Sequence, residues 1–290
     1  MDAEKCAVLL EVLECGSLSA AAEKLGYTPS GMSRLIAALE HEVGFTLLSR
    51  GRFGVIATAE CKALIPALTE FVAAERTCEE LAASILGLEQ GRLVVGSAYP
   101  QFYHVLAEII VAFSGKHPGI RIDIVQANSS ILIERMERRE IDFALVSKRE
   151  NVQSWTSLMQ DDMVAVLPKD HPFAAKKTFP IGRFAEEAFI EVYPGEESDN
   201  SRTLKACGVE PNVRHSVHDT KAAFALVEAG LGITMMNDIF VRNADADVVW
   251  IPVSPHAAAE IGIATPQGVP SPALEAFSAF ALPQLKRAKI

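Results

Sequence analysis

The sequence predicts an α/β protein of about two domains, in which a helical N-terminal segment precedes a longer region of alternating strands and helices. The length of 290 residues suits this division, because domains commonly hold roughly 150 residues. A hydrophobic content of 49% and a charged content of 22% are typical of a globular chain. Short apolar runs of strand type recur from Arg92 onward, whereas the chain before that point carries mostly helix signals.

Three short helices are expected in the first 60 residues. The first spans Cys6 to Cys15. A serine can cap the second, whose "SAAAEK" run combines high helix propensity with little bulk, and Gly26 ends it. Thr28 followed by Pro29 supplies the cap and the first position of the third helix. One face of that helix is apolar and consists of Met32, Leu35, Ile36 and Leu39.

The second and third helices form a helix-turn-helix pattern. Two short helices joined by a tight turn near a glycine make the unit whose second helix enters the major groove of DNA. The stretch "SRGRFGVIAT" then has a glycine-centred turn between residues of strand type, which predicts a small hairpin, or wing. This order of helix, helix-turn-helix, "LEHEVG", Arg50 and wing resembles the LysR-type transcriptional regulators, and the resemblance continues through most of the chain. The chain departs from the family's usual residues at Pro29-Ser30, Leu48 and Cys61.

The predicted DNA contacts lie at the start of the third helix and in the wing. Hydroxyl and guanidinium groups there can reach phosphates or base edges. The resemblance implies that Ser33, Arg34 and Arg50 match positions that contact DNA in the family. For Ser33 an alternative stays open, since a serine on a helix surface can bond its own backbone. With double-stranded DNA as the partner, the full predicted set is Thr28, Ser30, Ser33, Arg34, Arg50 and Arg52.

The acidity of the chain restricts how it can bind DNA. The formal net charge is -10, and residues 1–60 carry five positive against eight negative side chains. Residues 28–58 alone carry three positive and two negative ones. Because non-specific affinity grows with the number of phosphates neutralised, weak binding to random DNA is expected. This favours a dimeric repressor or activator that reads sequence, and disfavours a protein that packages DNA.

Residues 61–90 predict a long helix. Apolar residues recur there at spacings of three, four and seven, as in a coiled coil, and Glu75 interrupts them. Pro66 should bend the helix because it lacks a backbone N–H. The resemblance implies the family's linker helix, which dimerises, and the family commonly forms tetramers through its effector domains. In the alternative, the stripe packs on the core of its own domain. The stripe consists of Cys61, Leu64, Leu68, Phe71, Cys78, Leu81, Ile85 and Leu88.

From residue 91 to residue 290, alternating strands and helices favour a parallel, doubly wound sheet. The resemblance implies a two-lobed effector domain built like a periplasmic binding protein. Its first lobe is expected over residues 91–160 plus 266–290, and its second over residues 161–265. A winged helix-turn-helix domain over residues 1–60 completes the division. Ligands of open α/β sheets lie at the carboxyl ends of strands, so the effector site is predicted in a cleft between the lobes.

Polar residues at predicted strand ends define that site. Hydroxyl and amide groups at helix starts, where backbone N–H groups and the helix dipole favour an anion, predict a small organic carboxylate or a polar metabolite of similar size. Ser97 and Ser129 are the expected direct ligands. Such residues can also be ordinary helix caps, and the acidic loop at Glu196 leaves room for a cationic effector. The predicted set is Ser97, Tyr99, Asn128, Ser129, Ser147, Lys148, Ser201 and Thr220.

The sequence carries no catalytic signature, so no enzyme activity, cofactor or metal is predicted. It lacks nucleophile-elbow, phosphate-loop and zinc-protease motifs, and "AGLGI" is too short for a dinucleotide fingerprint. His215 and His218 would point to opposite faces of an extended segment. The carboxylate run Glu196, Glu197 and Asp199 is expected in a solvated loop. Five scattered cysteines match neither a zinc site nor a disulfide framework.

Two functions of different class are compatible with these observations. The preferred one is a DNA-binding transcriptional regulator, a homodimer or homotetramer whose activity a small-molecule effector modulates. The alternative is a small-molecule-binding α/β protein or enzyme whose N-terminal helices mediate association. With neither a signal segment nor an apolar run of about 18 residues, the chain is expected in the cytoplasm, without a membrane partner.

Overall fold

The computed structural model divides into two compact units, Met1–Gly91 with Val269–Pro272, and Arg92–Gly268 with Ala273–Ile290. It describes residues 1–51, 54–86, 90–152, 154–242 and 244–288. None of the described helices combines the length and the apolar character that a membrane span requires.

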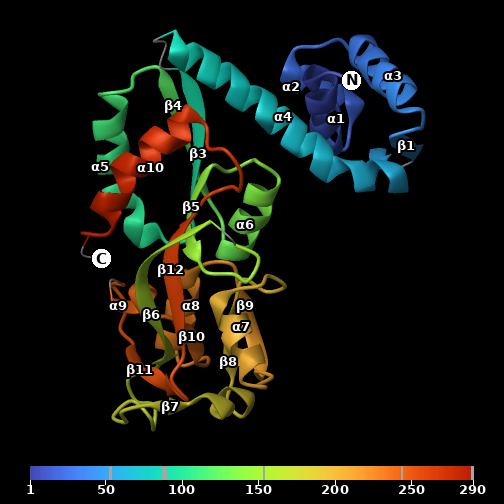
Figure 1. The fold of residues 1–290 in the computed structure, drawn as a ribbon. Coiled ribbons are helices and arrows are strands. Elements are labelled where there is room, and N and C mark those ends of the chain that lie inside the picture. Colours follow the sequence, from blue (N-terminus) through green and yellow to red (C-terminus); the bar gives the residue numbers. More distant parts are fainter. Residues whose placement is uncertain (52–53, 87–89, 153, 243, 289–290) are drawn as a thin grey trace. The chain divides into compact units, whose positions relative to one another are not determined.

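Three helices open the first unit: α1 (Ala3–Cys15), α2 (Leu18–Leu25) and α3 (Pro29–Val43) (Figure 1). The α1 helix starts three residues before the predicted Cys6, because the Asp2 carboxylate caps it by accepting a hydrogen bond from the Lys5 N–H at 2.9 Å. Side chains also cap the next two helices, Ser17 before α2 and Thr28 before α3. These caps confirm the predicted positions of the turn and of the third helix.

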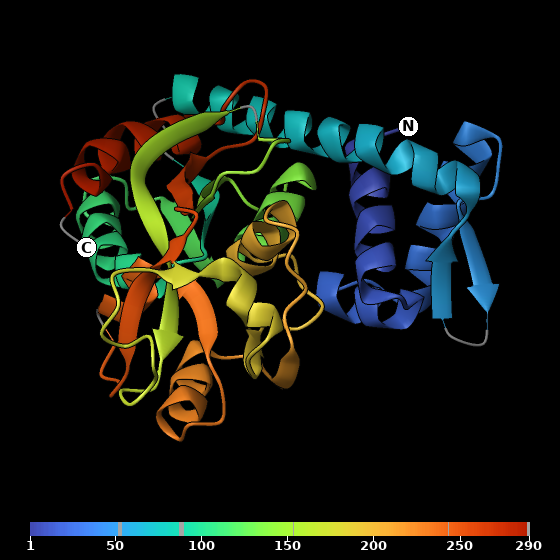
Figure 2. The same cartoon turned by 90° about the horizontal axis from the view of Figure 1, so that it is seen from below.

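A two-stranded antiparallel hairpin, β1 (Leu48–Gly51) and β2 (Gly54–Ala57), forms the wing (Figure 2). The Val55 N–H donates to the Gly16 carbonyl at 2.9 Å, which ties the wing to the end of α1. Gly54 has φ +108, and a Cβ at this position would lie 2.5 Å from the Gly16 oxygen. Glycine is therefore the residue that lets the hairpin approach α1 this closely.

The long helix α4 (Ala59–Ile85) has 27 residues, a length of about 40 Å at 1.5 Å per residue. Its first half packs on its own unit: Cys61 and Leu68 are buried in one core with residues of α1, α2 and α3. From Phe71 to its end the helix carries exposed apolar side chains, Phe71 at 40%, Leu81 at 41% and Ile85 at 85%. The predicted stripe therefore divides into a core part and an exposed part; Leu88 lies outside the described residues.

The second unit is built on a mixed sheet with the strand order β4-β3-β5-β12-β6-β11-β7, and β10 also pairs with β6. A separate parallel pair joins β8 to β9. The strands are β3 (Gly91–Ser97), β4 (Ile120–Gln126), β5 (Phe143–Ser147), β6 (Trp155–Leu167), β7 (Phe179–Pro180), β8 (Phe189–Val192), β9 (Val213–Val217), β10 (Thr234–Asn237), β11 (Val249–Ser254) and β12 (Ala258–Ala264).

The prediction of a parallel sheet was wrong for much of this unit. β3 and β5 are parallel, but β12 is antiparallel to both β5 and β6, and β10 and β11 are antiparallel to β6. The reason is topological: β12 returns from near the C-terminal end of the chain and inserts between β5 and β6, so the two strands are not neighbours. Alternating strand and helix signals do not reveal such an insertion.

Helices cover both faces of the sheet. In the first lobe, α5 (Tyr103–Ser114) and α10 (Pro272–Leu285) pack on one face and α6 (Ser129–Glu137) on the other (Figure 1). In the second lobe, α7 and α8 contribute to two separate cores. The remaining elements are α7 (Asp199–Ala206), α8 (Thr220–Glu228), α9 (Asp238–Arg242) and the 3-10 turns Pro100–Phe102 and Ile181–Ala185.

Two strands, β6 and β12, run through both lobes. In the first lobe, β5 pairs with the C-terminal half of β12. In the second lobe, β10 and β11 pair with the C-terminal half of β6. Asp162 of β6 and Ala258 of β12 face each other in the ladder. The chain therefore enters and leaves the second lobe at one place.

Candidate functional site

The α3 helix buries one face and exposes the other. Met32, Ile36 and Leu39 are buried in the core of the first unit. Among the predicted DNA contacts, Thr28, Ser30 and Arg34 are exposed, and Ser33 is half-buried. The Thr28 hydroxyl accepts the Gly31 N–H at 3.1 Å and lies 3.3 Å from the Ser30 hydroxyl. Three of the predicted contacts thus lie on the solvent side of the helix.

Ion pairs neutralise the two lysines of this helical region. Lys5 Nζ lies 2.6 Å from a Glu42 oxygen and 2.8 Å from an Asp2 oxygen. Lys24 Nζ lies 2.6 Å from a Glu11 oxygen. Arg34, in contrast, has no ion-pair partner among the residues that the structure describes. Its charge is therefore available to a phosphate or a base.

The wing is attached to α3 by a carboxylate. Glu40 Oε1 accepts hydrogen bonds from the backbone N–H groups of Leu47 at 2.7 Å and Leu48 at 3.2 Å. In the hairpin, Arg50 of β1 stands opposite Val55 of β2. The other predicted wing contact, Arg52, lies outside the described residues. Glu40 thus fixes where the first wing strand begins relative to α3.

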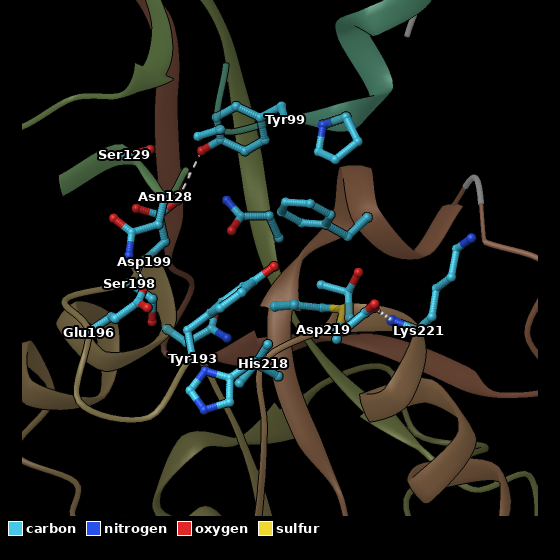
Figure 3. A pocket seen from close by; sticks show the side chains of 18 of the residues that line it. Tyr99, Asn128, Ser129, Tyr193, Glu196, Ser198, Asp199, His218, Asp219 and Lys221 are labelled. Carbon is cyan, nitrogen blue, oxygen red and sulfur yellow. Dashed lines mark hydrogen bonds between the residues drawn. The ribbon is translucent and has the colours of Figure 1, made fainter. Parts of the chain in front are cut away.

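A cavity of about 1160 Å³ lies between the two lobes of the second unit (Figure 3). Its walls come from the segments that follow β3 and β4, from the loop before α7, and from the start of α8. Four predicted effector residues line it: Tyr99, Asn128, Ser129 and Thr220. The structure therefore brings together residues from both lobes at the predicted strand ends.

The other four predicted residues do not line the cavity. The buried Ser97 hydroxyl accepts the Tyr99 N–H at 3.2 Å and donates to the Tyr99 carbonyl at 3.1 Å. Lys148 pairs with Glu260 at 3.2 Å. Ser201 forms a capping box with Ser198 at the start of α7, and Ser147 is buried behind the lining. Other groups of the chain thus already bind each of these four side chains.

Asp199 joins the two lobes. Its side chain, from α7 in the second lobe, is 12% exposed and accepts hydrogen bonds from Ser147 Oγ at 2.6 Å, Tyr99 Oη at 2.9 Å and Arg149 Nη1 at 3.0 Å. Arg149 is itself 6% exposed. The prediction of a solvated loop was therefore wrong for Asp199, because lobe closure buries it against a guanidinium.

Ser129 contacts Ser147, one of the residues that bind Asp199. Its hydroxyl accepts the Ser147 N–H at 2.9 Å and lies 3.0 Å from Ser147 Oγ. Burial, with the negative charge of Asp199, raises the pKa of the Tyr99 phenol well above its usual value. Tyr99 therefore stays a neutral hydrogen-bond donor to the carboxylate. Two residues of the predicted effector set, Tyr99 and Ser147, thus already donate to the carboxylate of Asp199, whereas Ser97 and Ser129 do not contact it.

Two further contacts connect the lobes beside Asp199. Asn128 Nδ2 donates to Glu196 Oε2, and Ser130 Oγ donates to the Glu197 carbonyl at 2.8 Å. Both donors stand at the start of α6 and both acceptors precede α7. The loop from residue 196 to residue 199 is therefore held against the first lobe at three places.

Tyr193 projects into the cavity between two carboxylates, Glu196 and Asp219 (Figure 3). Its backbone is left-handed, with φ 59, which is uncommon for an aromatic residue. Burial, followed by the charges of Asp219 and Glu196, raises the pKa of its phenol. The sequence reasoning missed Tyr193, since nothing in "VYPG" signals that conformation. It also missed Arg149, because the cation directly after the apolar strand is Lys148, and the pattern does not show which of the two neighbours is buried.

Asp161 lies where β6 passes between the lobes and is 1% exposed. Its carboxylate accepts the Ile239 N–H at 3.2 Å, at the start of α9. Burial raises the pKa of this carboxyl from 3.8 to about 6. In the described part of the chain, no three His, Cys, Asp or Glu side chains are grouped so that they could hold a metal ion.

Comparison with known proteins identifies both units. The LysR substrate binding domain matches residues 86–286, and the bacterial regulatory helix-turn-helix protein, lysR family, matches residues 4–62. The regulator YybE of Bacillus subtilis is 27% identical over 276 residues, 90% of this chain and 91% of YybE. The crystal structure of the LysR family regulator CbnR covers 99% of this chain and 100% of CbnR, with a TM-score of 0.60 at 19% identity. CbnR complexed with its target DNA covers 98% of this chain and 100% of that one, with a TM-score of 0.58 at 20% identity.

The family match extends over most of the chain and includes both the DNA-binding and the effector-binding parts. The likeness to CbnR concerns the fold. The alternative of an α/β protein with a helical association module is not favoured. The chain belongs to the LysR family of transcriptional regulators, DNA-binding proteins that an effector-binding domain controls and that are not enzymes.

Proposed function

We propose that residues 1–60 bind operator DNA, that residues 61–90 pair two chains, and that residues 91–290 bind the effector. The observation that carries the DNA assignment is the division of α3 into a buried apolar face and an exposed face bearing Ser30 and Arg34. The proposed contacts are Thr28, Ser30, Ser33, Arg34, Arg50 and Arg52, at the helix start and in the wing.

Arg34 is the contact that can be tested most directly. Because it has no ion-pair partner in the described residues, Arg34→Ala removes a charge without breaking an internal bond. Loss of one arginine contact to DNA costs about 1–3 kcal/mol. A gel shift with DNA from upstream of the gene, at fixed salt, should therefore show operator affinity reduced by about 5- to 150-fold.

The matched control is Arg214→Ala, an exposed arginine of β9 in the second unit. This variant should bind the operator like the wild type. Unchanged operator binding by a folded Arg34→Ala variant would refute the assignment of α3. In CbnR, a full-length chain of the same fold is complexed with its target DNA, which supports testing the full chain.

The oligomer is proposed from residues 71–85 of α4. Phe71, Leu81 and Ile85 are apolar and exposed, and their spacing of ten and four places them on one side of a helix. A stripe of this kind on a soluble regulator indicates a partner helix. A second copy of α4 provides a matching stripe, so a homodimer is proposed, with the homotetramer as a further step.

The effector is proposed to bind in the cavity lined by Tyr99, Asn128, Ser129 and Thr220. The sequence favoured an organic carboxylate held by Ser97 and Ser129. Such a ligand would have to displace the carboxylate of Asp199 from Ser147 and Arg149, since these groups already bind it. The carboxylate stays a prediction and is one arm of the test described next. The proposed location is the cytoplasm.

A further inference from the structure

We propose that the effector is an organic cation, a protonated amine that also carries a hydrogen-bond acceptor. The amine would lie against the Tyr193 ring, between Glu196 and Asp219. This inference rests on the proposed function, since it names the ligand class of the same cavity. It does not depend on which operator the protein binds.

The charge of the cavity supports a cation. Five carboxylates line it, Glu196, Asp199, Asp219, Glu228 and Asp245, against the two cationic side chains Arg149 and Lys221. The ion pair between Asp199 and Arg149 is internal and leaves four carboxylates facing one lysine. Inside a partly buried cavity this imbalance attracts cations more strongly than it would in water.

The position that suits an anion is already filled. A carboxylate bound by a guanidinium and two hydroxyls is the arrangement expected for an acidic ligand, and Asp199 supplies that carboxylate from within the chain. Apart from Lys221, the charged groups that remain in the lining are carboxylates.

Tyr193 gives the cation an aromatic face. Figure 3 shows its ring entering the cavity, with Glu196 on one side and Asp219 on the other. A cation held over an aromatic face beside carboxylates gains from both the ring and the charges.

Asn237 indicates the second group of the ligand. It is 3% exposed and lines the cavity. Although its side chain approaches Asp161, its amide nitrogen has no hydrogen-bond partner within the described chain. A buried N–H without a partner is costly, so a ligand oxygen that accepts from it would gain affinity. An amine bearing a hydroxyl or carbonyl satisfies both requirements.

Three probes test this inference: aminobutanol, butanediol and hydroxybutyrate. They share a carbon chain of the same length and a hydroxyl group, and their second end group is an amine, a hydroxyl and a carboxylate respectively. Calorimetric titration of the full chain should show aminobutanol binding at least about tenfold more tightly than hydroxybutyrate. Glu196→Gln and Asp219→Asn should each lower the affinity for aminobutanol about tenfold and leave the affinity for butanediol unchanged. Both substitutions keep the hydrogen-bonding shape, because glutamine can still accept from Asn128 and asparagine can still cap α8.

Two controls complete the design. Asp170→Asn, an exposed carboxylate that does not line the cavity, should leave all three affinities unchanged. Tyr193→Leu should lower the affinity for aminobutanol more than the affinity for butanediol, because it removes the aromatic ring but keeps an apolar side chain.

Hydroxybutyrate binding more tightly than aminobutanol would overturn the inference and leave the effector cavity in place. Failure of all three probes to bind at millimolar concentration would overturn it as well. The gel shift with the operator needs no effector, so it reports failure of the proposed function separately.

Discussion

Removing the carboxylate of Asp199 should strongly destabilise the second unit. Asp199→Ala deletes three hydrogen bonds and leaves Arg149, a side chain that is 6% exposed, with its charge unpaired. Breaking a buried ion pair in this way costs about 3–5 kcal/mol. At about 2–4 °C per kcal/mol for a unit of this size, the melting temperature should fall by about 10 °C.

Calorimetric unfolding of the full chain measures this loss, and formate tests its cause. In the Asp199→Ala variant a small carboxylate can occupy the space beside Arg149 and Ser147. At a formate concentration of about 100 times its dissociation constant, formate binding should restore about 2.7 kcal/mol of the free energy of unfolding. Chloride at the same ionic strength should restore much less, because it cannot bridge the guanidinium and the two hydroxyls.

The neighbouring Glu197→Ala is the matched control. Its ion pair with Arg202 spans 3.3 Å with both side chains partly exposed, so its loss should cost less than about 1 kcal/mol. The reasoning is refuted if Asp199→Ala melts like Glu197→Ala, or if formate and chloride stabilise it equally. Either result would mean that the ion pair does not hold the lobes.

Other predictions concern the lobe junction, the linker helix and the wing. Because burial raises the pKa of Asp161 to about 6, the folded chain keeps a proton that the unfolded chain loses near pH 3.8. The contribution of Asp161 to stability should therefore fall by up to about 3 kcal/mol as the pH rises through this window. Carboxylates with lowered pKa values, such as Glu187 and Glu260, act in the opposite direction, so the fall is measured as the difference between the wild type and Asp161→Asn in urea titrations. Ile85→Lys should give folded monomers in light scattering, whereas Leu68→Lys should unfold the first unit; a dimer mass for the former contradicts the proposed seam. Gly54→Ala should cost the first unit about 2 kcal/mol, because its Cβ would press on the Gly16 carbonyl at a strained φ; an unchanged melting temperature would disprove that contact.

Local chemistry made the first unit predictable from sequence. Thr28 and Pro29 start α3, Ser17 starts α2, and Gly26 ends it, each through a contact with residues a few positions away. The sheet of the second unit was not predictable in this way. The pairing of Ser147 with Ile261 depends on how the whole chain returns, and no local pattern encodes it.

The site was predictable only where it follows strand ends. Asn128 and Ser129 were found because they follow β4 and start α6. Asp199 was placed in a solvated loop because its neighbours Glu196 and Glu197 are also acidic, and that composition is typical of exposed loops. Its burial comes from Tyr99 and other partners that lie far away in the sequence, which only the closed lobes bring near.

The chain enters the second lobe at Asp162 and leaves it at Ala258, which is paired with Asp162, and this arrangement bears on how the family can evolve. Because these residues are neighbours on paired strands, everything between them is an insertion whose ends meet. Recombination within the gene could replace that insertion without altering the first lobe, α4 or α3. Such an exchange would preserve Arg149 and Ser147 and could supply a new Tyr193 or Asp219, but the incoming segment would have to keep a carboxylate at the position of Asp199. Regulators that share one operator and respond to different effectors could arise in this way.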